Sequence, residues 1–155
     1  MTKRPLRALL LLFMTAIVAT AVYTAYWYYT AAEVRAAIAE WSAQRRAAGW
    51  QVEIGHTYVR GFPSNIEVHV HTPRLAGPTG RWSWEAPKIW ASARPWSPGA
   101  VTVFAPGTHV YSSNKAYLRA EFERAVAEIK AGVSGAPEII VRLGVIKLQN
   151  PAGST

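Results

Sequence analysis

The feature that most constrains this chain is an uncharged stretch of 25 residues near its start, Ala8–Ala32. A helix over this stretch would be about 37 Å long at about 1.5 Å per residue, enough to cross a hydrocarbon layer of about 30 Å. A basic head precedes it, and its second part is aromatic: Lys3, Arg4 and Arg7, then Tyr23, Tyr26, Trp27, Tyr28 and Tyr29. The pattern predicts a transmembrane helix and leaves about 120 residues, enough for one modest core.

Lysine and arginine at one end and an aromatic belt at the other predict the orientation of this helix. The N-terminus is expected in the cytoplasm and the rest of the chain outside. A cleaved signal peptide is the alternative, because Ala8–Val22 has the length of a signal-peptide core and Ala19-Thr20-Ala21 is a candidate cleavage site. That site lies inside the apolar run, which favours an uncleaved signal anchor over a cleaved signal peptide. A buried soluble helix is the least favoured interpretation. The first two interpretations export the domain.

Composition excludes several classes of chemistry. The chain has no cysteine, so disulfides, thiolate metal sites and cysteine nucleophiles are excluded. All nine acidic residues are glutamate, which excludes the usual EF-hand loop and any triad that needs aspartate. The net charge is +8, of which the basic head supplies three, and the remaining excess is spread out. We therefore expect no nucleic-acid partner, but a weak attraction to anionic lipid headgroups, about 1 kcal/mol per basic residue.

Residues 33–49 are predicted to form an amphipathic stalk helix. Val34, Ala37, Ile38 and Trp41 recur at helical spacing on one face, and Gly49 is a favourable stop. This stripe could lie on the membrane surface, but packing against the chain's own domain is the favoured interpretation.

From Trp50 the apolar period changes to two, which is typical of strands. We expect one face to carry Trp50, Val52, Ile54, His56 and Tyr58. A turn at 60–65 leads to a second strand, with Ile66, Val68 and Val70 inward and Glu67, His69 and His71 outward. The pattern predicts a β-hairpin.

The rest of the chain reads as short extended pieces separated by proline. They are Arg81–Glu85, Ile89–Arg94, Val101–Ala105 and His109–Ser112, and Pro73, Pro87, Pro95, Pro98 and Pro106 mark strand ends or edges. Segment 116–131 fits either a helix or a strand. Residues 138–149 are rich in β-branched side chains and predict a late strand.

The predicted fold class is mainly β: an antiparallel sheet preceded by a transmembrane helix and an amphipathic stalk helix. The predicted parts are a basic head and signal anchor at 1–32, the stalk at 33–49, an exported β-rich domain at 50–149 and a disordered tail at 150–155.

An ordered set of short motifs resembles a known family. The motifs are Ala39-Glu40-Trp41, Gly49-Trp50-Gln51-Val52-Glu53, Arg60-Gly61-Phe62-Pro63, Pro73-Arg74-Leu75, Trp82-Ser83-Trp84-Glu85-Ala86-Pro87 and Pro95-Trp96. They resemble the bacterial family called Domain of Unknown Function 2125, from the anchor to His109. The resemblance implies an exported, membrane-anchored, β-rich protein in the bacterial inner membrane with a periplasmic domain. Members are substantially longer, so it also implies the N-terminal part of that pattern with a short or divergent C-terminus.

The resemblance supplies no catalytic residues. A more distant likeness, of fold only, links the chain to large extracytoplasmic β-groove proteins that handle lipid.

Tryptophan is the first candidate functional residue type. Five tryptophans of the β-rich part could line an apolar groove for lipid: Trp50, Trp82, Trp84, Trp90 and Trp96. Core packing is the favoured alternative, because each aromatic side chain buries about 150–250 Å². Gly61, Phe62 and Pro63 could form a recognition loop but are expected to form a structural turn, with Phe62 filling the core and Pro63 fixing the backbone.

Glu67, His69 and His71 form a low-ranking candidate zinc site, because alternate residues of one strand point the same way. His109 or His56 could complete it. The simpler interpretation is a solvated polar face.

No nucleophile elbow or paired carboxylates are recognisable, so we expect no enzyme activity and no cofactor. The leading hypothesis is a non-catalytic envelope module whose partners are membrane lipid and an envelope protein or a second copy. Lipid binding in a tryptophan-lined β-groove and zinc binding at His69 and His71 are the alternatives.

Overall fold

The structure is a computed structural model that describes residues 3–131, 137–144 and 146–149. These residues form one long helix, α1 (Lys3–Ala47), followed by strands only. The expected fold class is therefore confirmed: mainly β, antiparallel, with an apolar N-terminal helix. The predicted tail at 150–155 lies outside the described residues.

Helix α1 is continuous through both the predicted anchor and the predicted stalk, and it ends where expected. Gly49 has a positive φ of 84°. Its N–H donates to the Arg46 carbonyl at 2.9 Å, and the Trp50 N–H donates to the Arg45 carbonyl at 3.0 Å. This pair of bonds is the Schellman motif, which satisfies the last carbonyls of a helix. The Arg46 side chain also donates to the Val52 carbonyl at 2.9 Å, which ties the helix end to the first strand.

The strands form two six-stranded antiparallel sheets. The first sheet has the order β1 (Gln51–Glu53), β4 (Arg74–Ala76), β5 (Trp82–Glu85), β8 (Gly107–Ser113), β9 (Tyr117–Phe122) and β12 (Ile146–Gln149). The second has the order β11 (Pro137–Leu143), β10 (Ala125–Ala131), β7 (Ser97–Phe104), β6 (Lys88–Arg94), β3 (Ile66–His71) and β2 (Thr57–Arg60). Segment 116–131, which the sequence left open, is thus two strands.

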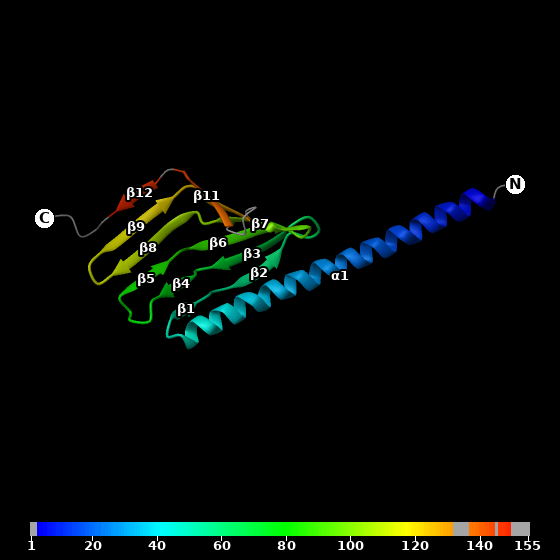
Figure 1. Cartoon of the computed structure of the whole chain (residues 1–155). Coiled ribbons are helices and arrows are strands. Elements are labelled where there is room, and N and C mark those ends of the chain that lie inside the picture. Colours follow the sequence, from blue (N-terminus) through cyan, green and yellow to red (C-terminus); the bar gives the residue numbers. More distant parts are fainter. Residues whose placement is uncertain (1–2, 132–136, 145, 150–155) are drawn as a thin grey trace.

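The two sheets are the halves of one long meander (Figure 1). The chain alternates between the halves two strands at a time, so that β3 continues into β4 and β5 into β6 across a short break. Backbone hydrogen bonds cross the breaks, from Gly55 N to His71 O (3.1 Å) and from Thr72 N to Pro87 O (2.9 Å). Three of the breaks contain Pro73, Pro87 and Pro106. Proline has no N–H to donate to a ladder, so these positions interrupt the pairing as the sequence predicted.

One face of the meander is apolar. Side chains that lie directly opposite each other on paired strands share a face. In the second sheet such a row contains Ile66, Ala93, Val101, Ile129 and Ile139. In the first sheet a row contains Val52, Leu75, Trp84, Tyr111 and Leu118. We call this side the apolar face and the other side the outer face.

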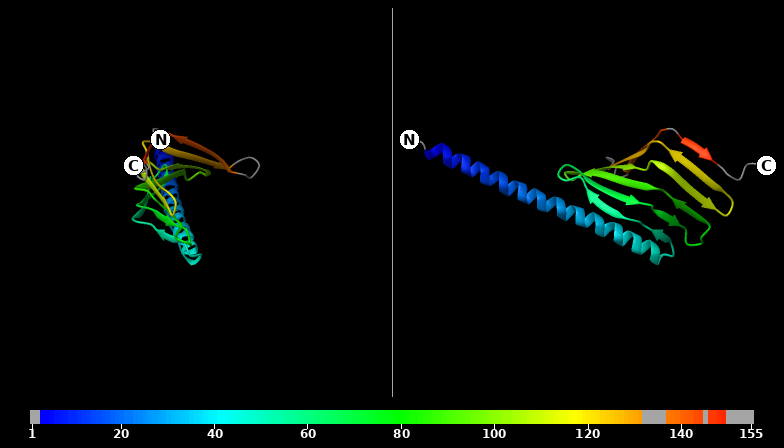
Figure 2. Two further views of the ribbon diagram at one scale, coloured as in Figure 1. Left: turned by 90° about the vertical axis from the view of Figure 1, so that its left-hand side faces the viewer. Right: turned by 180° about the vertical axis from the view of Figure 1, so that it is seen from behind.

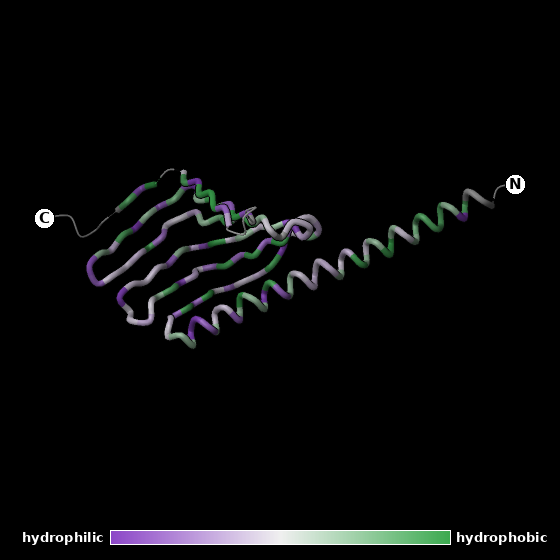
Figure 3. Tube along the Cα trace, in the orientation of Figure 1, coloured by the Kyte–Doolittle hydropathy of each residue, from purple (hydrophilic) through white to green (hydrophobic). Residues whose placement is uncertain are grey.

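Helix α1 packs along the β1–β2 side of the meander, and the β10–β11 hairpin lies at the opposite edge (Figures 1 and 2). Trp27 and Ala31 from the helix and Ile66 from β3 form the buried cluster, with Val34 and Val59 packed against it. Ala31 has no exposed surface, because its small side chain lets the helix approach the sheet closely. Figure 3 shows that the apolar N-terminal part of α1 extends well beyond the sheet.

One predicted alternation is wrong. Tyr58 was expected on the same face as Val52 and Ile54. In the structure Tyr58 is on the outer face, stacked on His69, whereas Val52 and Ile54 line a pocket on the apolar face. The break at Gly55–His56 shifts the alternation, because an irregularity between two strands changes which side the following residues face.

Candidate functional site

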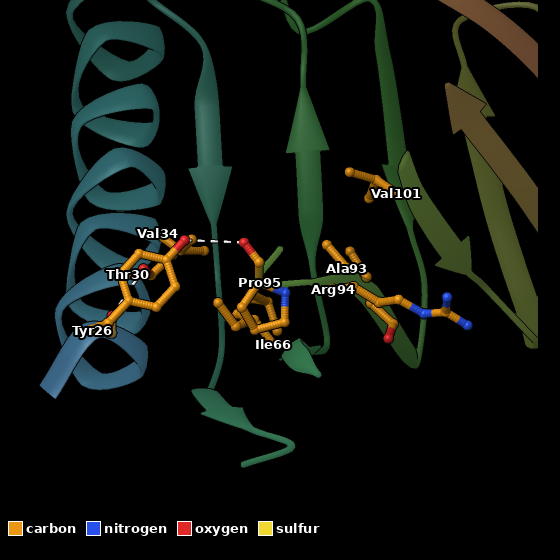
Figure 4. Close-up of a pocket in the computed structure, with 11 residues that line it drawn as sticks. Tyr26, Thr30, Val34, Ile66, Ala93, Arg94, Pro95 and Val101 are labelled. Atoms are coloured by element: carbon orange, nitrogen blue, oxygen red, sulfur yellow. Dashed lines mark hydrogen bonds between the residues drawn. The ribbon is translucent and has the colours of Figure 1, made fainter. Parts of the chain in front are cut away.

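A pocket of about 390 Å³ lies between α1 and the second sheet (Figure 4). The helix contributes Tyr26, Thr30 and Val34, and strand β3 contributes Ile66 and Val68. The rest of its wall comes from β6, β7 and the turn between them: Ala91, Ser92, Ala93, Arg94, Pro95 and Val101. The Tyr26 hydroxyl donates to the Pro95 carbonyl at 3.0 Å, so the helix and the β6–β7 turn are joined at one end of the pocket.

The docking of the helix creates this pocket. Trp27 is 3% exposed and its indole N–H donates to the Asn65 carbonyl at 3.0 Å. Tyr26 and Thr30 flank Trp27 on the helix, and small side chains, Ala91 and Ala93, face them from β6. The space that these alanines leave is the pocket, and its lining is apolar apart from a few groups at its rim.

A second pocket of about 260 Å³ lies further along the helix, towards its C-terminal end. Ile38 and Trp41 from α1 face Val70 and Ile89 of the second sheet. Val52, Leu75 and Trp84 of the first sheet complete the wall, with Glu53, Ile54, Pro73 and Arg74. The stripe of the predicted stalk therefore packs on the chain's own domain, as expected, and the apolar face runs through both sheets.

Among residues 3–131, 137–144 and 146–149, no helix covers the far part of the apolar face. Exposed apolar side chains continue the rows on β9, β11 and β12: Leu118, Ile139, Val141, Leu143, Ile146 and Leu148. Such a contiguous patch on a protein surface marks a binding or membrane-contact region more often than it is incidental.

The structure separates the five tryptophans. Trp84 lines the second pocket, and Trp82, two residues away on β5, shares its face. Trp50 packs edge-on against Trp82, with ring centroids 5.6 Å apart. Trp90 instead lies on the outer face, and Trp96 is at the β6–β7 turn, 61% exposed. Trp50, Trp82 and Trp84 therefore lie together on the apolar face, and Trp90 and Trp96 lie elsewhere.

The break between β5 and β6 explains the position of Trp90. If side chains alternated strictly between the two faces, Trp82, Trp84 and Trp90 would all lie on the same face. Ala86 and Pro87 interrupt the strand, so Ile89 and Ala91 take the apolar face and Trp90 the outer one.

The Gly61-Phe62-Pro63 segment forms the β2–β3 turn, as expected. Gly61 has a φ of 106°, and a Cβ there would lie 2.6 Å from the Asn65 carbonyl oxygen, so the turn requires glycine. Phe62 does not fill the sheet core. It is 47% exposed and packs on the helix, with its ring centroid 5.5 Å from that of Trp27. The carbonyl of Pro63 accepts a hydrogen bond from Tyr23.

The outer face carries a stack of four aromatic rings across four strands. Tyr58, His69, Trp90 and Phe104 lie in one cross-strand row, and successive ring centroids are 4.9, 5.9 and 5.0 Å apart. His69, which was expected on a solvated face, is 1% exposed because the rings of Tyr58 and Trp90 cover it. Its Nε2 is 3.2 Å from Glu67, which also pairs with Arg60 at 3.2 Å.

This geometry does not assemble the candidate zinc site. Glu67 and His69 contact each other, but in the part of the chain that the structure describes no three histidine and glutamate side chains come together as a metal site would need. His71 lies beside Tyr58 instead, 5.8 Å from it between ring centroids.

The pKa values of His69 and Glu67 are both lowered. Burial between two rings lowers the pKa of His69, although its hydrogen bond with Glu67 acts in the opposite direction. The hydrogen bond from His69, and then the pairing with Arg60, lower the pKa of Glu67. His69 Nδ1 is buried without a partner, which favours the neutral ring with its proton on Nε2.

We predict that acid destabilises the β domain partly through His69. Below about pH 6.5 the unfolded chain binds a proton at this ring that the folded chain does not, so the free energy of unfolding falls. His69→Phe keeps the ring stack and should flatten the decrease in melting temperature between about pH 6.5 and pH 5. The control is His56→Phe, which replaces an exposed histidine. Parallel pH profiles for wild type and His69→Phe would contradict the assignment.

The chain is related to one known protein family over most of its length. The model of a family described as "Uncharacterized protein conserved in bacteria (DUF2125)" matches residues 27–155, well over half of the chain. The chain belongs to this family. The match extends beyond His109, where the motifs recognisable by eye end. No curated protein and no solved structure matches the chain.

The DUF2125 region begins at Trp27, the buried helix residue, and contains both pockets apart from Tyr26. Docking of the helix on the sheet is thus part of the DUF2125 region itself. The family's description names no reaction or ligand.

Proposed function

We propose that this protein is a single-pass, membrane-anchored envelope protein whose β domain is non-catalytic and holds an acyl chain of a membrane lipid. The observation that carries the proposal is the pocket between α1 and the apolar face. It is formed by a helix that is long and apolar enough to span a membrane.

The pocket suits an acyl chain. Its volume of about 390 Å³ lies in the range of small-molecule sites, about 300–1,000 Å³. Each methylene group buried from water contributes about 0.8 kcal/mol, so an alkyl chain gains affinity without any specific polar contact. The exposed apolar residues of β9, β11 and β12 extend the same surface beyond the pocket.

The proposed location is the bacterial inner membrane, with the N-terminus in the cytoplasm and the β domain in the periplasm. The basic head and the aromatic cluster at the two ends of the apolar run support this orientation. The family match supports the bacterial part of this proposal, because the family is described as conserved in bacteria.

A photoreactive lipid tests the proposal. The full-length protein in native membranes is crosslinked to a phospholipid with a diazirine at the end of its acyl chain, and the modified peptides are mapped. We expect adducts on strands β3, β6 and β7 around the pocket, in addition to those on Leu6–Val22 that any spanning helix would acquire. Adducts confined to Leu6–Val22 would contradict lipid binding by the domain.

A second copy of this chain is the second candidate occupant of the apolar face. It is favoured by the edge strands β11 and β12, where Ile139, Val141 and Leu148 are exposed. An unpaired sheet edge with apolar side chains is a template for pairing with another strand. The mass of the gently extracted protein distinguishes the two, since a dimer doubles it and a lipid adds a small increment.

A further inference from the structure

We propose that one end of the β domain is embedded in the lipid headgroup layer, so that the pocket opens directly onto the bilayer. This turn end consists of the β2–β3 turn at 61–65 and the β6–β7 turn at Pro95 and Trp96. The inference rests on the part of the proposed function in which α1 spans the membrane. It does not require lipid in the pocket.

The length of the helix sets the depth of the turn end. A hydrocarbon layer of about 30 Å needs about 20 helical residues. Counted from Ala8, the first residue after the basic head, these residues end near Trp27. Every residue from Leu6 to Val22 is exposed, so nothing in the domain competes with lipid for this part of the helix. Residues Tyr23 to Trp27 therefore lie at the outer boundary of the hydrocarbon.

Those same residues hold the two turns. Tyr23 donates to the Pro63 carbonyl, and the ring of Trp27 contacts Phe62 in the β2–β3 turn. Tyr26 donates to the Pro95 carbonyl in the β6–β7 turn at 3.0 Å. A turn that is hydrogen-bonded to a helix residue at the membrane boundary must lie at the same depth. From there α1 continues along the sheet to Ala47, which carries the other end of the domain away from the membrane (Figure 1).

The side chains of the turn end fit this depth. Phe62 and Trp96 are large, apolar and exposed, and Tyr26, Tyr28 and Tyr29 are exposed on the helix beside them. Aromatic side chains are enriched at the membrane–water interface, where an apolar ring and a polar tip are both solvated well. The far turns at 77–81 and 114–116 contain glycine, proline, threonine, asparagine, alanine and basic residues but no aromatic residue. In the helix–β1 turn at the same end, Trp50 is half-buried and packs on Trp82.

The pocket begins at this level. Tyr26 and Pro95 form one end of its wall, and the wall continues along the helix to Val34 (Figure 4). With the turn end in the headgroup layer, an acyl chain could pass from the bilayer into the pocket without crossing water. Extraction of a lipid into water normally costs about 0.8 kcal/mol for each methylene group that becomes exposed. This route would avoid that cost.

Single-cysteine reporters test the proposed depth, because the chain has no cysteine of its own. Ser64→Cys and Trp96→Cys report on the turn end, and Thr79→Cys and Lys115→Cys on the far turns. All four positions are exposed, so the substitutions should leave the fold intact. Each full-length variant is labelled with an environment-sensitive fluorophore and reconstituted in phosphatidylethanolamine–phosphatidylglycerol vesicles that contain a headgroup-region nitroxide lipid.

We expect the nitroxide to quench the labels at positions 64 and 96 at least about threefold more than those at 79 and 115, with blue-shifted emission at the first pair. Equal quenching at all four positions would overturn the proposal. Retention of the protein in carbonate-washed vesicles reports separately whether α1 spans the membrane. Crosslinking of acyl chains to the pocket reports separately whether lipid binds there.

Discussion

Replacing Trp27 by alanine should detach α1 from the sheet at the cost of about 3–5 kcal/mol, the usual range for a buried aromatic residue changed to alanine. Trp27 is 3% exposed, packs on Ile66 and Phe62, and satisfies the Asn65 carbonyl. The substitution removes all three contacts. It also leaves a cavity beside Ala31, where the helix approaches most closely. The expected consequence is local opening of the helix–sheet contact, since residues Leu6–Val22 of the helix are exposed and do not depend on that contact.

Hydrogen exchange of the β2 and β3 amides in the detergent-solubilised full-length protein measures this opening. A loss of about 3 kcal/mol corresponds to roughly a hundredfold faster exchange when exchange proceeds through local opening. Tyr29→Ala is the matched control, because Tyr29 is two residues away on the same helix and its side chain is exposed. If the β2 and β3 amides were equally protected from hydrogen exchange in both variants, the helix would not dock on the sheet as described.

The second large effect is expected when a bulky side chain is introduced into the pocket. Ala91→Trp places an indole in the space between β6 and α1, where the pocket wall has only a methyl group. Acyl-chain crosslinking to β3, β6 and β7 should then fall at least about tenfold, which corresponds to about 1.4 kcal/mol of lost binding free energy. Crosslinking to Leu6–Val22 should stay unchanged, because that part of the helix is remote from the pocket.

Thr102→Trp is the control for this substitution. Thr102 lies on β7 in a cross-strand row with Ser92 and Glu128, on the face that carries the ring stack rather than the apolar one. The same bulk is therefore added to the same sheet on its other side. If both variants lost crosslinking equally, the loss would reflect general damage to the fold, and if neither did, the lipid would not occupy this pocket.

The features that the sequence predicted correctly are those determined by local chemistry. The helix ends at Gly49 because its C-terminal cap needs a residue with a positive φ, which glycine adopts readily. Pro73, Pro87 and Pro106 fall at strand breaks because each lacks an N–H, whatever its neighbours are. The turn at Gly61 is also determined locally, because a Cβ at this position would collide with Asn65, four residues along the chain.

The features that sequence reasoning missed depend on partners distant in the chain. His69 follows a regular alternation that predicts a solvated side chain, but Tyr58 and Trp90 from the two neighbouring strands bury it. Trp90 itself changes face because of an irregularity at Ala86–Pro87, whose effect on alternation cannot be read from residue types.

The pocket was the least predictable feature. Its wall joins Tyr26, in the aromatic part of the predicted anchor, to two alanines of β6 that are 65 or more residues away. Ala91 and Ala93 matter because they leave space, and Ala31 because it lets the helix approach the sheet closely. A search for large apolar side chains passes over all three. The spacing of Ala91 and Ala93 gave one usable signal, because they alternate on a predicted strand, as the residues of one face must.

Native mass spectrometry of the full-length protein, gently extracted from its membrane, tests most directly whether the domain holds lipid. We predict a stoichiometric lipid adduct on the monomer that survives collisional activation in the wild type and in Thr102→Trp and is lost in Ala91→Trp. A bare monomer mass for the wild type, or a dimer without lipid, would contradict lipid binding as the function of this domain.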